Sequence, residues 1–293
     1  LNPGMAGMMD GGMRITGIYR TQWSEVMTPF NTAGLSIDAN TNKNLNLGAH
    51  FLSQSAGDAG YKYLNAYATL AYSGVKFGPD QNQRISIGIQ AGLLSRRFDP
   101  AKFQFGDQWN PITGYNPGAV SADVITRTSS SVLDVGAGIA YFDASPEKTV
   151  NFYGGVAAFH LTRPQDPFVA SGVKQYLPVR YTAHAGARIQ VNETLSVIPN
   201  VLYMRQGTAS EEMVGLFGQL TVNDYTDVLF GANYRVKDAI SPYVGVAFHD
   251  FVLGASYDVN TSDLGKAVTG TNSIEVSFTY MGRKSGKPLR YLS

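Results

Sequence analysis

The alternation of apolar and polar side chains is the feature that most constrains the fold of this chain. Residues 273–280 show it in full, with Ile274, Val276, Phe278 and Tyr280 between Ser273, Glu275, Ser277 and Thr279. In a β-strand, this spacing places all the apolar side chains on one face. Segments of about ten residues with the same pattern recur along the whole chain, and a closed cylinder with lipid outside satisfies all of them. We therefore predict an all-β fold, a transmembrane antiparallel β-barrel of the outer-membrane type.

Alternation and turn signals together predict about fourteen strands. Their expected ranges are 12–21, 31–40, 44–53, 61–74, 83–95, 131–143, 149–162, 179–191, 194–206, 212–222, 226–236, 240–248, 250–259 and 271–282. The connections after even-numbered strands are short, and most of the others are longer. Short turns face the periplasm in such barrels, so we expect residues 1–11 to form a periplasmic N-terminal segment and the C-terminus to lie on the same side.

Composition supports one domain over residues 1–293. Apolar residues make up 44% of the chain and charged residues 15%, and no composition shift or linker divides it. No apolar run is long enough for a helical span. Cysteine is absent, which rules out thiolate chemistry and disulfides. A net charge of +1 argues against a nucleic-acid partner. The opening residues carry no export signal, and we expect one upstream of Leu1.

Charged side chains share the polar face of the strands and must line the lumen, because an Arg in hydrocarbon would cost about 2–4 kcal/mol. The inward set is Arg14, Arg20, Arg84, Arg180, Arg188, Arg235, Asp134, Asp227, Asp258 and Glu275. Asp258 and Glu275 lie on adjacent strands, and Arg14 and Arg20 are their candidate partners across the seam that closes the barrel. We expect these four residues to form a structural ion network.

Aromatic side chains fall in two kinds of place. Those expected to face lipid near strand ends are Tyr19, Tyr72, Tyr141, Phe159, Tyr203, Tyr234, Tyr257 and Tyr280. The long connection 96–130 contains Phe103, Phe105, Trp109 and Tyr115, which predicts either a plug inside the barrel or an extracellular contact surface. With Trp23 and the 163–178 loop, these four are the candidate partner-binding residues.

Catalytic and metal-binding patterns are weak. Three histidines (His50, His160 and His184) fall on lumen positions, but the spacing of His160 and His184 suits hydrogen bonding better than a shared ion. No G-x-S-x-G motif is present, and residues 282–287 lack the spacing of a phosphate loop. We predict no enzyme activity, cofactor or metal site, and interpret residues 283–293 as a basic C-terminal tail.

Several segments, in order along the chain, resemble the PorP/SprF family of outer-membrane proteins of the type IX secretion system in the Bacteroidetes. They are Leu1–Gly4 with Ala6–Gly7, Tyr19–Trp23, Asp134–Tyr141, Tyr153–Gly155, His160–Pro164, and Ser256–Asp258 through Thr261–Gly265 to Glu275–Ser277. The Gly4-Met5-Ala6 step departs from the alanine-tyrosine-alanine or alanine-tyrosine-serine step usual in the family.

The resemblance implies an outer-membrane component of protein export and gliding machinery. Its implied partners are a secreted or surface-anchored protein, bound through that protein's C-terminal domain, and periplasmic lipoprotein or ring components. A passive porin-like channel for small solutes is the alternative function, and a soluble all-β binding module is a third. Steady conductance in bilayers would favour the channel, and good behaviour without detergent would favour the soluble module.

Overall fold

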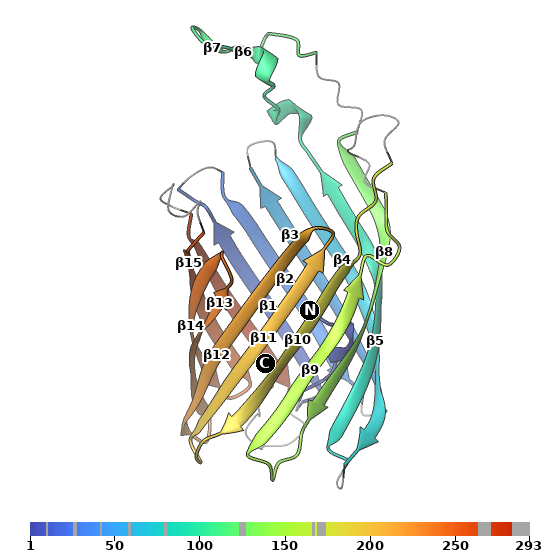
Figure 1. Ribbon diagram of the computed structural model, residues 1–293, viewed down its shortest axis with the longest axis vertical. Helices are drawn as coiled ribbons and strands as arrows, with labels where there is room; N and C mark the ends of the chain where they lie inside the picture. Colours follow the sequence, from blue (N-terminus) through green and yellow to red (C-terminus); the bar gives the residue numbers. More distant parts are fainter. Residues whose placement is uncertain are drawn as a thin grey trace.

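The computed structural model describes residues 1–9, 11–25, 28–41, 43–57, 60–78, 81–122, 127–165, 168, 174–262 and 271–282. Fourteen antiparallel strands close into one barrel, as the alternation predicts. Figure 1 shows the strands tilted around a common axis. The expected basic tail, residues 283–293, lies outside the described residues.

The barrel strands agree with the predicted ranges to within a few residues. They are β1 (Met13–Gln22), β2 (Phe30–Asn40), β3 (Leu45–Ala56), β4 (Tyr61–Phe77), β5 (Gln83–Arg97), β8 (Ser129–Asp143), β9 (Val150–Phe159), β10 (Arg180–Gln190), β11 (Leu195–Gln206), β12 (Ala209–Asn223), β13 (Thr226–Arg235), β14 (Ala239–Phe248), β15 (Phe251–Asn260) and β16 (Ser273–Gly282). β1 pairs with β16 from Met13 opposite Gly282 to Gln22 opposite Ser273, and this ladder closes the cylinder.

Strand β5 shows why the barrel needs lipid around it. Its outward side chains Ile87, Ile89 and Leu93 are 47%, 56% and 55% exposed, whereas the inward Ser86 and Gln90 are 0% and 6% exposed. The same pattern repeats around the barrel, so the outer surface is a continuous apolar band.

Phe159 does not face lipid, and the prediction for this residue was wrong. The outward side chains of β9 include Phe152 and Val156, which are 58% and 57% exposed, so strand alternation turns Phe159 inward. Phe159 is 4% exposed, and the guanidinium carbon of Arg180 lies 4.6 Å from its ring centroid. The strand also ends earlier than predicted, because His160 adopts a left-handed backbone with φ of 59°.

The two ends of the barrel differ. One, the short-turn end, carries residues 41, 43–44, 78, 81–82, 144–149, 191–194, 224–225 and 249–250. The other, the long-loop end, carries residues 98–122, which contain the 3₁₀ turns η2 (Pro100–Lys102) and η3 (Gly106–Gln108) and the short strands β6 (Trp109–Asn110) and β7 (Gly114–Tyr115). Figure 1 shows β6 and β7 beyond the barrel rim rather than inside the lumen.

The inner wall holds the start of the chain. The 3₁₀ turn η1 (Pro3–Met5) contacts β4, β5, β8 and β9. Among the described residues, no helix is long and apolar enough to cross a membrane.

Candidate functional site

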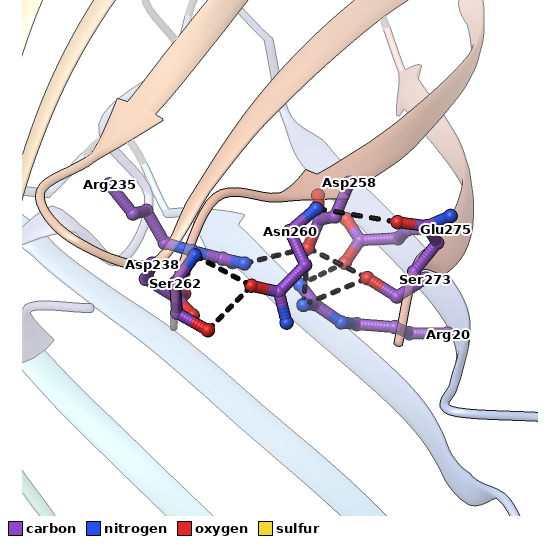
Figure 2. A network of polar contacts seen from close by, with 9 residues as sticks. Arg20, Arg235, Asp238, Asp258, Asn260, Ser262, Ser273 and Glu275 are labelled. Atoms are coloured by element: carbon purple, nitrogen blue, oxygen red, sulfur yellow. Dashed lines mark hydrogen bonds and ion pairs between the residues drawn. The ribbon is translucent and has the colours of Figure 1, made fainter. Parts of the chain in front are cut away.

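A group of charged side chains, which we call the seam cluster, lies where the last strands meet the first (Figure 2). Asp258 on β15 is its centre, with a side chain that is 8% exposed. Its Oδ2 atom accepts hydrogen bonds from Arg20 Nη2 at 2.6 Å, Arg235 Nη2 at 2.8 Å and Ser273 Oγ at 2.7 Å. These donors come from β1, β13 and β16, so one carboxylate joins both sides of the closing seam.

Two further carboxylates flank the arginines of the seam cluster. Glu275 Oε2 lies 3.6 Å from Arg20 Nη1, and Asp238 Oδ2 lies 2.7 Å from Arg235 Nε. The register explains the first contact, because Arg20 stands directly opposite Glu275 in the β1–β16 ladder. Each arginine therefore has a second acidic neighbour besides Asp258.

The structure brings three of the four predicted network residues together, namely Arg20, Asp258 and Glu275. Arg14 lies elsewhere, with its Nε and Nη2 atoms each 3.0 Å from the carboxylate of Asp38 on β2. Arg235 was predicted to face the lumen but not to belong to the network. Its inward parity and its position at a strand end are the signals that point to it.

Trp23 borders a polar cavity of about 360 Å³ beside the seam cluster. Its backbone is left-handed, with φ of 59°. Its ring packs edge-on against Phe30 at a centroid distance of 5.2 Å, and its amide donates to the Asn272 carbonyl at 3.1 Å. Trp23 thus belongs to the seam, apart from the other aromatic candidates, which lie in residues 98–122.

Residues 98–122, which we call the aromatic loop, hold the other four partner-binding candidates in two groups. Phe103 packs against Phe98 and against Phe105, with both centroid distances 5.9 Å. Trp109 and Tyr115 pair across the β6–β7 ladder at 5.5 Å. The Phe98–Phe103–Phe105 group lies where the loop joins the barrel. The Trp109–Tyr115 pair lies on β6 and β7, in the part that projects from the barrel (Figure 1).

The projecting part of the aromatic loop is ordered by its own polar contacts. Asp107 Oδ2 accepts hydrogen bonds from the Ala122 amide at 2.7 Å and from Ser121 Oγ at 2.9 Å. These two hydrogen bonds hold the pKa of the Asp107 carboxyl below its ordinary value, and the bond from the Ala122 amide has the larger effect. Gln108 Nε2 donates to the Ala119 carbonyl at 2.7 Å and closes the loop further.

Residues 1–9, which we call the N-terminal segment, lie against the inner wall. Asn2 Nδ2 donates to the Ile139 carbonyl at 3.0 Å and to the Val156 carbonyl at 3.3 Å. Asp38 Oδ2 accepts from the Gly7 amide at 2.8 Å. A periplasmic segment was predicted for residues 1–11, but the hydrogen bonds of Asn2 and Gly7 attach this part of the chain to the inside of the barrel.

Glycine makes room for the N-terminal segment. A Cβ atom added to Gly88 on β5 would lie 2.3 Å from the Pro3 carbonyl, and one added to Gly138 on β8 would lie 2.1 Å from Asn2 Oδ1. Both positions face the lumen, where any side chain would push the segment away.

The lumen histidines are held by hydrogen bonds and ring stacking. His160 Nδ1 lies 2.7 Å from Asp134 Oδ2, which also accepts from Tyr67 Oη at 2.6 Å. His184 Nε2 lies 3.2 Å from Asn2 Nδ2, and His50 stacks on Tyr67 with centroids 4.9 Å apart. Within the described part of the chain, no three His, Asp or Glu side chains form a group suited to a metal ion.

The model of one protein family, described as type IX secretion system membrane protein PorP/SprF, matches residues 1–280. The chain belongs to the PorP/SprF family. It is therefore an outer-membrane β-barrel of the type IX secretion system, and the family points to a structural or transport role.

Solved structures of other outer-membrane barrels share the fold of this PorP/SprF protein. The Ralstonia pickettii toluene transporter TbuX is 11% identical, with a TM-score of 0.55 over 96% of this chain and 92% of its own. The P. putida toluene transporter TodX is 10% identical, with a TM-score of 0.53 over 97% and 93%. At such identities the likeness concerns the fold alone. No curated protein matches the chain.

The segments that carry the PorP/SprF resemblance converge on the sites described above. Tyr19–Trp23 supplies Arg20 and Trp23 to the seam, and Ser256–Asp258 supplies its central carboxylate. Leu1–Gly4 packs on Asp134–Tyr141, which is part of β8. Residues 263–265 of the resemblance lie outside the described residues.

Proposed function

We propose that this barrel binds a secreted or surface-anchored protein of the type IX pathway through its aromatic loop and performs no catalysis. The observation that carries the proposal is the exposed apolar surface of the projecting loop. Trp109 is 55% exposed, Ile112 is 93% exposed and Val120 is 96% exposed. Exposed apolar residues grouped on an ordered loop are typical of protein-binding surfaces.

The order of the loop favours binding. The hydrogen bonds of Asp107 and Gln108 and the β6–β7 ladder hold Trp109 in place before a partner arrives. A preorganised aromatic anchor loses less conformational entropy on binding than one on an unstructured loop. The short-turn end is then left for the periplasmic lipoprotein or ring components, a role that rests on the family alone.

The seam cavity is a second contact candidate. It carries Trp23 together with Arg20, Arg235 and Glu211, so it offers an aromatic ring and charges of both signs. Such a mixed polar rim suits specificity more than affinity. We infer that the aromatic loop anchors the partner and that the seam cavity discriminates among partners.

The N-terminal segment inside the lumen supports a binding role over a role as a passive channel. The N-terminal segment occupies the wall of β4, β5, β8 and β9, which narrows the route through the barrel. Purified protein in planar bilayers should therefore show no large steady conductance, and a steady porin-like conductance would favour the channel.

Purification of tagged protein in mild detergent from its native host, followed by mass spectrometry, tests the binding role. The wild-type protein should recover a secreted partner. The variant Trp109→Ala combined with Ile112→Ser should lose most of it, as should deletion of residues 103–117. Tyr225→Ala is the matched control, because Tyr225 is an exposed aromatic residue at the opposite end of the barrel, 57% exposed. Equal recovery of the partner by all variants would refute the proposal.

A further inference from the structure

The lumen contains a cavity of about 530 Å³ whose wall is largely apolar. Ile198 and Leu202 on β11, Met213 and Phe217 on β12 and Leu229 on β13 face it. Met5 of the N-terminal segment also contributes to the lining. The cavity has the volume of a small-molecule site.

These apolar side chains occupy inward positions, where strand alternation predicts polar residues. Contact with lipid does not explain these apolar side chains, because the lipid-facing positions of β12 are Val214 and Leu216, which are 54% and 58% exposed. Phe217 instead packs edge-on against Tyr243 of β14, with ring centroids 5.8 Å apart. A wall of this kind holds water poorly and favours an apolar occupant.

Two carboxamides mark a polar corner of the same cavity. A Cβ atom added to Gly215 would lie 2.6 Å from Asn200 Oδ1 and 2.3 Å from Asn233 Oδ1, so the two amides converge over this glycine. Both asparagines line the cavity. Asn233 Oδ1 is buried and has no hydrogen-bond partner among the described residues, although a buried acceptor normally has one.

The permanently charged side chain in the lining is already paired. Arg14 is the arginine in the lining, and its Nε and Nη2 atoms are both engaged by Asp38. An anionic ligand would have to break this pair. The uncharged amides and the aromatic pair instead suit a neutral molecule.

We propose that this cavity is a binding site for an uncharged, ring-containing apolar small molecule. The molecule has one hydrogen-bond donor, and Asn233 Oδ1 accepts the hydrogen bond from it. The flat rings of the ligand pack between Phe217, Leu229 and Met213, and methionine adapts to irregular shapes. The site is separate from the protein-binding surface of the aromatic loop, so either proposal can fail without the other.

The probe for this site is N-phenylnaphthalen-1-amine, an uncharged two-ring-system molecule with one N–H donor. Its fluorescence is titrated with the whole protein in lipid nanodiscs, and the signal of nanodiscs without protein is subtracted. We expect one saturable site per barrel. 1-Phenoxynaphthalene, which has the same shape and no donor, should compete for it with about fivefold weaker affinity, the worth of one hydrogen bond.

Variants separate cavity binding from partitioning into lipid. Leu229→Trp fills the cavity and should abolish saturable binding, whereas Leu220→Trp, on the lipid face of β12, should leave it unchanged. Asn233→Leu should lower the affinity for the amine to that of the ether. Met213→Phe, on the adjacent strand β12, is a second filling variant if Leu229→Trp fails to fold. The inference is overturned if protein-containing and empty nanodiscs take up the probe equally, or if both filling variants retain the site.

Discussion

Replacement of Asp258 by Leu tests whether the seam cluster closes the barrel. The change removes three hydrogen bonds to Asp258 Oδ2 and leaves Arg20 and Arg235 facing each other without their shared carboxylate. Breaking a buried ion pair from one side costs about 3–5 kcal/mol. Glu275 and Asp238 still neutralise the two arginines in part, so we expect the lower end of this range, a loss of about 3 kcal/mol.

Two further substitutions calibrate this value. Asp258→Asn keeps the shape and one acceptor oxygen but loses the charge, and we expect a loss of about 1–2 kcal/mol. Asp238→Asn is the matched control, because the Asp238 side chain is 54% exposed and its carboxylate pairs with Arg235. An exposed ion pair of this kind contributes less than about 1 kcal/mol.

Reversible unfolding by urea in phospholipid bilayers, followed by tryptophan fluorescence, measures these differences from the midpoint at constant slope. The expected order of stability is wild type, Asp238→Asn, Asp258→Asn and Asp258→Leu. The reasoning is refuted if Asp258→Leu unfolds within about 0.5 kcal/mol of the wild type, since the seam would then owe its stability to the β1–β16 ladder alone.

Three other perturbations address the N-terminal segment, the lipid face and the aromatic loop. Gly88→Val should displace the N-terminal segment and raise bilayer conductance, whereas Gly17→Val should not, because nothing lies within 4 Å of a Cβ at Gly17; equal conductance would contradict the contact. Ile89→Arg places a charge on the lipid face and should destabilise the barrel by about 2–4 kcal/mol in the same urea assay. Because hydrogen bonds lower the pKa of Asp107, the order that it gives the loop should persist above the ordinary carboxyl value of 3.8 and vanish as pH falls through the lowered one. The NMR chemical shift of the Ala122 amide reports this order. An Ala122 amide shift in Asp107→Asn that equals the wild-type shift would count against the role of Asp107.

Local pattern was enough to predict the barrel. A strand sends alternate side chains to opposite faces whatever its neighbours are, so residues 273–280 alone separate a lipid face from a lumen face. Turn residues and connection lengths then predict the strand number and the two ends. Arg20, Asp258 and Glu275 could be paired in advance because the first and last strands of a closed barrel must adjoin. Phe159 was assigned to the wrong face, since one residue at a strand end decides the parity.

Tertiary structure alone decided what fills the barrel. The N-terminal segment has no alternation of its own, and its place beside Gly88 and Gly138 follows from which strands curve around it. The pairing of Arg14 with Asp38 and the meeting of Asn200 with Asn233 over Gly215 likewise depend on the register of neighbouring strands and on the closure of the cylinder. Alternation along a strand is a property of the backbone, whereas contacts across a lumen exist only once all the strands have closed around it.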